Sequence, residues 1–312
     1  MLVLWITWMA CTPAPLDTDT SLGTDTSVGS DTDTASDSGS VTDTDPATGT
    51  DSGTDTQAGG RCTVAPARVS CTHEVATLHA GADGAEERVL RWQIPVGLPP
   101  ASGWPAVVLF QGSLTPTIGY WDASSSATYG MYYGAQLTAE LLDRGYAVLT
   151  PEARDNGTAW WDTNIPPYTT SWTTAPDHFL MLDLLAHIDA GDYGGIDTDR
   201  LFASGISSGG FMTSRMAASY AGRFRALAVQ SASWATCGST WCVVPTLPED
   251  HPPTLLLHGQ LDAVVPVWMM EAYNLRLGEA GIEHDTVTAP ALGHQWLPEA
   301  PTAVADWFDA HR

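Results

Sequence analysis

Five residues in the middle of the chain have the types and the spacing that serine chemistry requires. Gly205-Ile206-Ser207-Ser208-Gly209 fits the pattern G-x-S-x-G, with an apolar run before it and a helix-like stretch after it. In this context the pattern predicts a sharp turn from strand to helix that projects Ser207, because glycines on both sides of the serine let the two elements approach closely. An ordinary glycine-rich turn would match the same pattern. The flanking elements favour a nucleophilic serine.

A serine hydroxyl becomes an effective nucleophile when a base lies within hydrogen-bond reach and a third group orients that base. In the chain order that accompanies such a turn, an acid follows the serine and a histidine comes last. Asp262 follows an apolar strand, and His294 lies in a glycine-bearing loop after the next strand. We therefore expect His294 as the general base and Asp262 as its orienting partner. The alternatives are a helix N-cap for Asp262 and a surface position for His294, while His258 is expected to pack beneath the site.

The negative charge of a tetrahedral intermediate requires two backbone N–H donors. One donor is expected from Ser208, the residue after the proposed nucleophile. The other is expected from Ser113, because the loop Gln111-Gly112-Ser113 follows the apolar strand predicted over residues 106–110. Together these residues predict an oxyanion hole.

The segments that must position these residues alternate between strand and helix patterns. Apolar runs predict strands over residues 88–94, 106–110, 146–150, 201–204, 227–230, 254–258 and 286–288. Helical periodicity predicts helices over residues 137–144, 177–189, 208–220, 267–277 and 302–310. Such alternation predicts βαβ units and therefore an α/β fold, in which helices cover both faces of a mostly parallel central sheet.

The charge of the chain excludes some classes of partner. The formal net charge is −24, and all 12 basic residues are arginine. Nucleic acid binding rests on neutralising phosphates, so an acidic chain with no basic stripe argues against a nucleic acid partner. It also argues against docking on anionic lipid headgroups.

The first sixty residues have the composition of a targeting segment and a linker. Residues 1–10 are apolar but too short to span a bilayer, which predicts a signal segment. Cys11 after a small residue is similar to a bacterial lipoprotein signal, although no basic residue precedes the apolar run. Residues 11–60 are rich in Asp, Thr, Ser and Gly and predict a disordered tether, while irregular Asp spacing argues against a calcium-binding repeat. Residues 61–312 are expected to form the catalytic domain.

Cysteine usage supports export. Apart from Cys11, the chain has Cys62, Cys71, Cys237 and Cys242. Four cysteines allow three pairings, and the two local pairs are the simplest because each closes a short loop. A zinc site is the alternative, but neither spacing matches the common zinc patterns. We therefore expect two disulfides and no metal site.

Across about residues 88–312 the chain resembles the α/β-hydrolase superfamily. The motifs that carry the resemblance are GISSGG, LLLHGQLDAVVP and LGHQW. Similarity to the poly(3-hydroxybutyrate) depolymerase and feruloyl esterase group is carried by GISSGGFMTSRMAASYAGRFRALAVQSASW. The resemblance implies a secreted serine esterase that needs no cofactor. Many relatives have His-Gly where this chain has Gln111-Gly112, an exchange that a backbone donor tolerates.

Thirteen tryptophans are many for this chain, and several fall in predicted loops. Loops at strand ends surround the site in such folds, so we expect an apolar cleft or a platform for a polymer chain. The candidate substrate-binding residues are Trp121, Trp160, Trp161, Trp234 and Trp296. For each of them, a core or loop-packing role is the alternative. An aromatic cleft beside an acidic surface favours neutral, apolar esters and leaves sugar esters open.

The leading hypothesis is a secreted or surface-tethered serine esterase that acts on carboxylic esters, with a polyester of the hydroxyalkanoate class as the expected substrate. The alternatives are a feruloyl or acetyl-xylan esterase, a peptidase with the same triad, and a non-catalytic surface binding module. The expected location is outside a bacterial cell or on its surface. Membrane contact is expected only through a lipid on Cys11.

Overall fold

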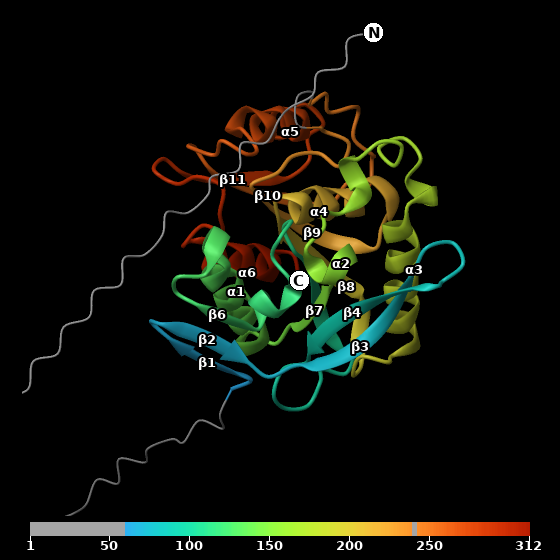
Figure 1. The fold of residues 1–312 in the computed structure, drawn as a ribbon, viewed down its shortest axis with the longest axis vertical. Helices are drawn as coiled ribbons and strands as arrows, with labels where there is room; N and C mark the ends of the chain where they lie inside the picture. The colour runs from blue at the N-terminus through green and yellow to red at the C-terminus, as the bar shows by residue number, and fades with distance from the viewer. Residues whose placement is uncertain (1–59, 239–241) are drawn as a thin grey trace, which may run out of the picture. The chain divides into compact units, whose positions relative to one another are not determined.

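An eight-stranded sheet lies at the centre of the computed structural model, which describes residues 60–238 and 242–312 (Figure 1). The predicted signal segment and tether lie outside the described residues. The strands run across the sheet in the order β11-β10-β9-β8-β5-β7-β4-β3. Their bounds are β3 (Glu74–Ala80), β4 (Glu86–Gln93), β5 (Trp104–Phe110), β7 (Ala147–Pro151), β8 (Ile196–Ile206), β9 (Phe224–Gln230), β10 (Thr254–Gly259) and β11 (His284–Ala289).

The sheet is mostly parallel, as expected from the alternation of strands and helices. Each neighbouring pair from β7 through β5, β8, β9 and β10 to β11 is parallel. Strand β4 pairs antiparallel with β7, and β3 pairs antiparallel with β4. Because the parallel strands end at the same edge of the sheet, the loops that follow them gather there, which is where ligands bind in open α/β sheets.

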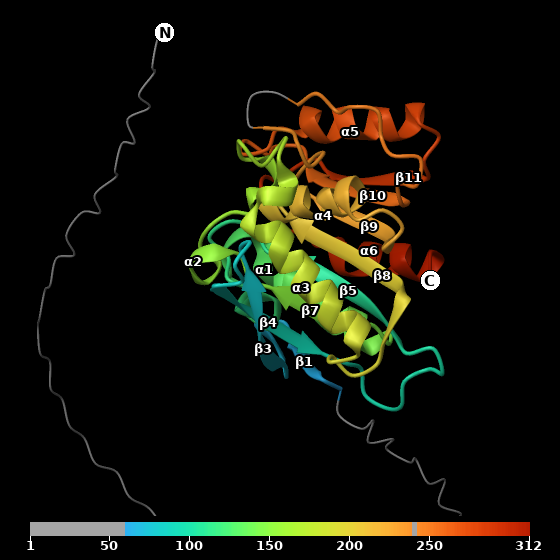
Figure 2. The same cartoon turned by 90° about the vertical axis from the view of Figure 1, so that its right-hand side faces the viewer.

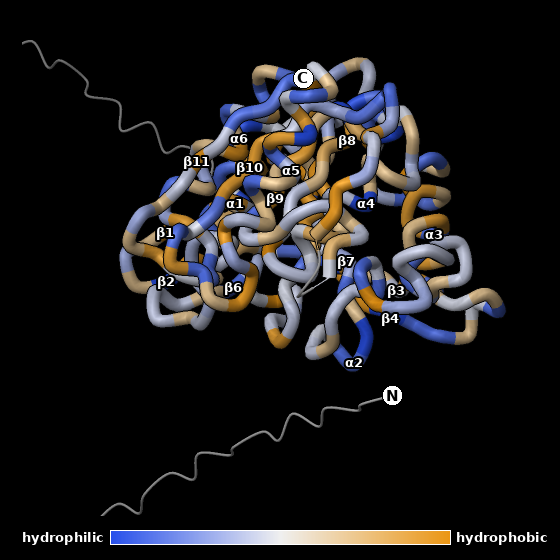
Figure 3. The backbone as a smooth tube through the Cα atoms, turned by 90° about the horizontal axis from the view of Figure 1, so that it is seen from above, coloured by the Kyte–Doolittle hydropathy of each residue, from blue (hydrophilic) through white to orange (hydrophobic). Residues whose placement is uncertain are grey.

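Five longer helices cover the two faces of the sheet (Figures 1 and 2). They are α1 (Met131–Asp143) and α6 (Ala300–Ala310) on one face, and α3 (Pro176–Ala190), α4 (Ser208–Ser219) and α5 (Val267–Glu279) on the other. Successive side chains of a strand point to opposite faces, so β5 supplies both cores. Its even-numbered residues from Ala106 to Phe110 pack on the α3–α5 side, whereas Val107 and Leu109 pack on the α1–α6 side. The central strands are accordingly among the most apolar segments (Figure 3).

A second, three-stranded sheet lies beside α1. It consists of β1 (Cys62–Ala65), β2 (Arg68–Cys71) and β6 (Asp122–Ser124), all antiparallel. The predicted Cys62–Cys71 disulfide joins β1 to β2. The remaining helical elements are short and lie in the loops: η1 (Thr117–Tyr120), η2 (Thr128–Gly130), α2 (Arg154–Gly157), η3 (Asp162–Asn164) and η4 (Trp172–Thr174).

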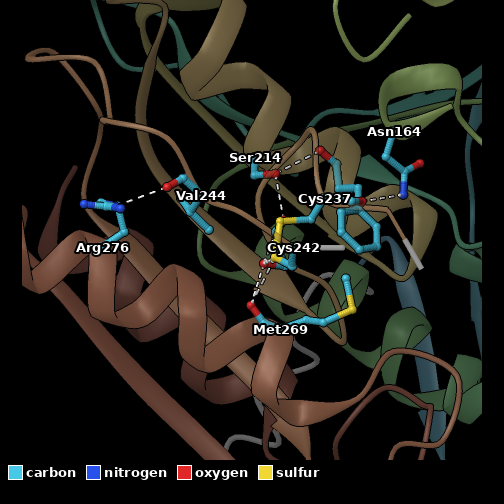
Figure 4. Close-up of a disulfide and its surroundings, with 9 residues drawn as sticks. Asn164, Ser214, Cys237, Cys242, Val244, Met269 and Arg276 are labelled. Atoms are coloured by element: carbon cyan, nitrogen blue, oxygen red, sulfur yellow. Dashed lines mark hydrogen bonds between the residues drawn. A yellow bond between two sulfur atoms is a disulfide. The ribbon is translucent and has the colours of Figure 1, made fainter. Parts of the chain in front are cut away.

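The other predicted disulfide, Cys237–Cys242, is also formed (Figure 4). The amide of Asn164 donates to the backbone oxygen of Cys237 at 3.2 Å, and the hydroxyl of Ser233 donates to the backbone oxygen of Met269 at 2.6 Å. The disulfide therefore lies where the segment after β9 meets η3 and the first turn of α5. None of the described helices is both long and apolar enough to cross a membrane.

Candidate active site

The turn at Ser207 has a backbone conformation that L-residues rarely adopt. Strand β8 ends at Ile206 and α4 begins at Ser208, and the residue between them has φ 58° and ψ −124°. Such a conformation costs of order 1–3 kcal/mol and persists only where surrounding structure enforces it. Here the N–H of Ser207 donates to the backbone oxygen of Gln230 at 3.0 Å. The strained serine that the sequence pattern predicts is present.

The glycines around Ser207 are required by close packing of backbone. A Cβ atom on Gly205 would lie 2.6 Å from the backbone oxygens of both Phe110 and Gly209. A Cβ atom on Gly209 would overlap the backbone oxygens of Phe110 and Gln111. Strands β5 and β8 and the first turn of α4 therefore meet only because these positions carry no side chain.

Asp262 and His294 meet although 32 residues separate them. Asp262 follows β10, His294 follows β11, and His294 Nδ1 lies 2.7 Å from Asp262 Oδ2. The other carboxylate oxygen accepts the N–H groups of Val264 and Val265 at 2.9 and 2.8 Å. Burial raises the pKa of Asp262, but hydrogen bonds from His258, His294 and Val265 lower it by more, so the net pKa lies below 3.8.

An ionised Asp262 fixes the chemistry of His294. A carboxylate only accepts hydrogen bonds, so the proton at the short contact lies on His294 Nδ1. Nε2 of the same ring is then free to accept a proton from a hydroxyl group. His258 lies beneath this pair, as expected: it is fully buried, and its Nε2 lies 2.8 Å from the backbone oxygen of Val265 and 3.4 Å from Asp262 Oδ2.

Ser207 and His294 line one cavity of about 170 Å³. The remaining lining residues are Gly112, Ser113, Leu114, Thr115, Tyr129, Ile206 and Val264. The ring of Tyr129 meets the His294 ring edge-on, with centroids 6.2 Å apart. No lining residue other than His294 can carry a positive charge, so the cavity suits a neutral, apolar group. Sequence reasoning did not identify Leu114, Tyr129 or Val264, because loop residues of these types carry no motif.

The loop after β5 lies against the serine turn. The Ser113 hydroxyl donates to the Ser208 hydroxyl at 3.1 Å, which brings the two predicted oxyanion residues together. Ser208 is the first residue of α4, so no acceptor within the helix takes its N–H. The side chain of Gln111 explains the departure from His-Gly: it accepts the N–H of Ala153 at 3.2 Å and donates to the oxygen of Gly157 at 2.5 Å. Gln111 thereby holds the loop after β7 against the oxyanion loop, which is the segment of residues 111–113 after β5 from which one oxyanion donor is expected.

Four of the five candidate substrate-binding tryptophans are buried, so the expectation that they form a cleft is wrong. Trp121, Trp161 and Trp296 have no exposed surface, and Trp234 is 3% exposed. None of the four lines the cavity. Trp160 is half exposed and does not line the cavity either. These four side chains have a packing role, which the sequence analysis gave as the alternative.

The buried tryptophans position other parts of the site. Trp161 Nε1 donates to the backbone oxygen of Gln111 at 2.9 Å, directly behind the oxyanion loop. Trp121 Nε1 donates to the hydroxyl of Thr150 at 2.8 Å. Trp296 packs edge-on against Tyr120 two residues beyond His294, with ring centroids 6.2 Å apart. Trp161 and Trp121 thus combine packing with one donated hydrogen bond, whereas Trp296 contributes packing.

Comparison with known proteins identifies relatives of the chain. No protein-family model matches it. A poly(3-hydroxyoctanoate) depolymerase of Pseudomonas fluorescens is 46% identical over 252 residues, which are 80% of this chain and 89% of that protein. A thermostable esterase of known structure has a TM-score of 0.53 at 18% identity, covering 76% of this chain and 62% of that one. A dipeptidyl peptidase 4 of Porphyromonas gingivalis has a TM-score of 0.50 at 16% identity, covering 77% and 35%.

The two kinds of similarity support different statements. At 16–18% identity the solved structures show a shared fold and nothing finer. Identity of 46% over most of both chains shows common family membership. The chain therefore has the α/β-hydrolase fold and belongs to the family of the poly(3-hydroxyoctanoate) depolymerase.

Proposed function

We propose that the protein hydrolyses carboxylic esters with Ser207 as nucleophile, His294 as general base and acid, and Asp262 as the residue that orients His294. The observation that carries the proposal is the convergence of Ser207 and His294 on one cavity, with His294 held 2.7 Å from the buried carboxylate. The family relationship to an ester-cleaving depolymerase supports the same reaction class.

The proposed reaction has two halves. Ser207 Oγ attacks the ester carbonyl carbon while His294 Nε2 takes the hydroxyl proton, and the oxyanion forms against the N–H groups of Ser208 and Ser113. Collapse of this intermediate releases the alcohol, which receives the proton from His294. Water then attacks the acyl-enzyme as His294 takes a proton from it. Breakdown frees the acid and returns the proton to Ser207.

A polyester of 3-hydroxyalkanoic acids with medium-length side chains is the proposed substrate. The relative from Pseudomonas fluorescens is named for poly(3-hydroxyoctanoate), a neutral ester whose acid units carry an alkyl side chain. The cavity supports this choice because Leu114, Ile206 and Val264 give it apolar walls. An alkyl group placed there gains about 0.8 kcal/mol for each buried methylene. Feruloyl and acetyl-xylan esters are less favoured because the expected tryptophan platform is not formed.

We further propose that the protein is exported and held at the cell surface by a lipid on Cys11. All four cysteines of the described residues are paired, and structural disulfides form mainly in oxidising compartments. Cys11 itself lies outside the described residues. Radiolabelled palmitate should be incorporated into the wild-type chain and not into Cys11→Ser; equal labelling of both would contradict the anchor.

The proposed function is tested by hydrolysis of p-nitrophenyl esters from acetate to decanoate by the full chain. Wild type should be active, and Ser207→Ala should lose at least about 1,000-fold in kcat because the nucleophile is removed. The matched control is Ser125→Ala, which alters an exposed serine away from the cavity. A preference for hexanoate to decanoate over acetate supports the polyester assignment. Activity of Ser207→Ala equal to wild type would refute the mechanism.

A further inference from the structure

Gln230 is a buried residue that contacts both halves of the candidate site. It is the last residue of β9, between β8 and β10, and it has no exposed surface. Its backbone oxygen accepts the N–H of Ser207 at 3.0 Å. Its side-chain Nε2 donates to the backbone oxygen of Gln295 at 3.0 Å, one residue beyond His294. One residue therefore links the turn that carries the serine to the loop that carries the histidine.

The peptide bond held by Gln230 is fixed from both of its polar ends. Its carbonyl belongs to Gln295, and its N–H belongs to Trp296. The carbonyl accepts the Gln230 amide, while the N–H donates to the backbone oxygen of Tyr129 at 2.9 Å. Peptide groups are planar, so holding both ends fixes the orientation of the whole unit and restrains the chain next to His294.

Among the described residues, the Gln230 side chain uses its donor and not its acceptor. Nε2 makes hydrogen bonds to Ser231 Oγ at 2.9 Å and to Gln295, whereas the buried Oε1 has no partner among the described residues. The side chain thus acts as a donor, and an apolar side chain of the same length would leave the Gln295 carbonyl without it. The hydrogen bond to the His294 loop is therefore the contact that depends on an amide at this position.

We propose that Gln230 is a positioning residue that fixes the His294 loop relative to Ser207. The inference rests on the proposed function, because it assigns a role within the same site. Gln230 does not line the cavity, so it acts through the Gln295–Trp296 peptide and not on the substrate. Misplacement of a catalytic group by about 1 Å can cost about 100-fold in rate. Loss of the hydrogen bond should therefore lower kcat and leave KM for a small ester nearly unchanged.

The test compares three variants of the full chain on p-nitrophenyl octanoate. Gln230→Met keeps the length of the side chain but cannot donate a hydrogen bond. Gln230→Glu has nearly the same shape and donates only when its carboxyl group is protonated. Gln260→Met is the matched control, because Gln260 follows the neighbouring strand β10, is exposed, and its side-chain amide bonds the Thr288 hydroxyl of β11. Circular dichroism melting confirms that each variant is folded.

Gln230→Met should lower kcat about 10- to 100-fold, with KM within about twofold of wild type. Burial raises the pKa of a carboxyl group, so Gln230→Glu should regain its donor as the pH falls. The ratio of its kcat to that of wild type should therefore rise toward acid pH, whereas the ratio for Gln230→Met stays flat. Gln260→Met should match wild type.

Two results would overturn the inference. One is a folded Gln230→Met with kcat within about twofold of wild type. The other is a folded Gln230→Glu whose kcat stays well below wild type with a flat ratio across the pH range, which remains decisive even where Gln230→Met fails to fold. Ser207→Ala, measured in the same assay, separates this outcome from failure of the proposed function. An inactive Ser207→Ala together with a fully active Gln230→Met refutes only the role of Gln230.

Discussion

Ser207 keeps its strained backbone because its neighbours are too close to allow any other course of the chain. Gly205 and Gly209 lie where any Cβ would meet backbone oxygens of β5 or of the loop after it. The same closeness brings the oxyanion loop to the first turn of α4, where Ser113 and Ser208 share a hydrogen bond. The glycines thus determine two things at once, the direction of the proposed nucleophile and the position of the two proposed oxyanion donors.

We predict that Gly209→Ala lowers both stability and activity. The added methyl group must displace the backbone at Phe110 and Gln111, so the oxyanion loop moves away from Ser207. Overpacking of this kind costs about 1–3 kcal/mol, and kcat should fall at least about 100-fold. Thermal melting and p-nitrophenyl octanoate hydrolysis measure the two effects. Gly238→Ala is the control, because its added methyl would meet nothing within 4 Å. Equal behaviour of the two variants would contradict this account of the turn.

We predict that Asp262→Asn impairs catalysis far more than it impairs substrate binding. An amide in place of the carboxylate can donate to His294 Nδ1, which turns the imidazole to the wrong tautomer and lowers kcat about 10⁴-fold. Because the pKa of Asp262 is depressed, the stability it contributes is complete above about pH 4 and is lost as the pH falls below that value. The difference in melting temperature between wild type and variant should therefore shrink below pH 4. A constant difference down to pH 2 would contradict the ionised state.

At the scale of elements, the sequence predicts the central strands and the edge strand β11 of the main sheet, but it does not predict the opposite edge. Strands such as β5 and β10 are fully buried, so their sequences are nearly continuous apolar runs that predict strands directly. Strand β3 at the sheet edge alternates polar and apolar residues and was not predicted. Helix α1 begins at Met131, six residues before the predicted start at 137, because its first turn is rich in tyrosine and glycine and lacks a strong apolar stripe.

The residues of the candidate site also divide into those that the sequence predicts and those that it does not. The triad candidates follow from residue type, chain order and strand ends, all of which are local properties of the sequence. The direction in which a loop side chain points is not local. Trp161 is buried because the loop after β7 folds back over β5, where Phe110 meets its ring edge-on at 5.4 Å. Tyr129 faces the cavity because its loop packs against the His294 loop. Both outcomes depend on contacts between segments far apart in the chain.

A buried charge network joins the loop after β7 to α3 and β4. Arg88 pairs with Asp177 at 3.1 Å, and Arg154 pairs with Asp162 at 2.7 Å. The N–H of Asp162 donates to the Asp177 carboxylate at 2.6 Å, so the two acids lie close together. Burial and the nearby charge of Asp177 raise the pKa of Asp162 to about 6, although Arg154 and Arg88 act in the opposite direction.

We predict that this network makes stability depend on pH in the range from about 4 to 6. The native state binds a proton at Asp162 where the unfolded chain does not, so stability falls as the pH rises through this range. Asp162→Asn removes the titrating carboxyl group, and with it this dependence of stability on pH. The melting temperature of the variant should therefore rise relative to wild type between pH 4 and pH 7. Asp155→Asn, at an exposed position of the same loop, should follow wild type. Parallel curves for wild type and Asp162→Asn would contradict the raised pKa.

At the scale of the whole molecule, one edge of the sheet brings together candidate site residues that follow four different strands. Ser113 follows β5, Ser207 follows β8, Asp262 follows β10 and His294 follows β11. Each comes from a different strand, so the site exists only when the sheet is assembled in its full order. Stability of the sheet and activity should consequently be lost together on unfolding. None of the four disulfide cysteines lines the cavity.

We predict that the disulfides stabilise the fold without taking part in the reaction. They close short loops, with sequence separations of 9 and 5, so each should contribute about 2–3 kcal/mol by restricting the unfolded chain. The double variant Cys237→Ser/Cys242→Ser should melt about 5–10 °C below wild type. Its kcat on p-nitrophenyl octanoate at 25 °C should remain within about twofold, because neither cysteine lines the cavity.

The compartment in which the protein folds should then decide how stable it is. Chains isolated from a reducing cytoplasm should melt at the temperature of a variant that lacks both disulfides, and chains isolated after export should melt higher. Dithiothreitol should lower the melting temperature of exported wild type to the cytoplasmic value and should leave the variant unchanged. The sign of this difference follows from the two cross-links, because the core of residues 61–312 is the same in the two preparations. Equal melting temperatures with no free thiol at the four cysteines of either preparation would show that these cysteines pair regardless of compartment, and the structural argument for export would fall.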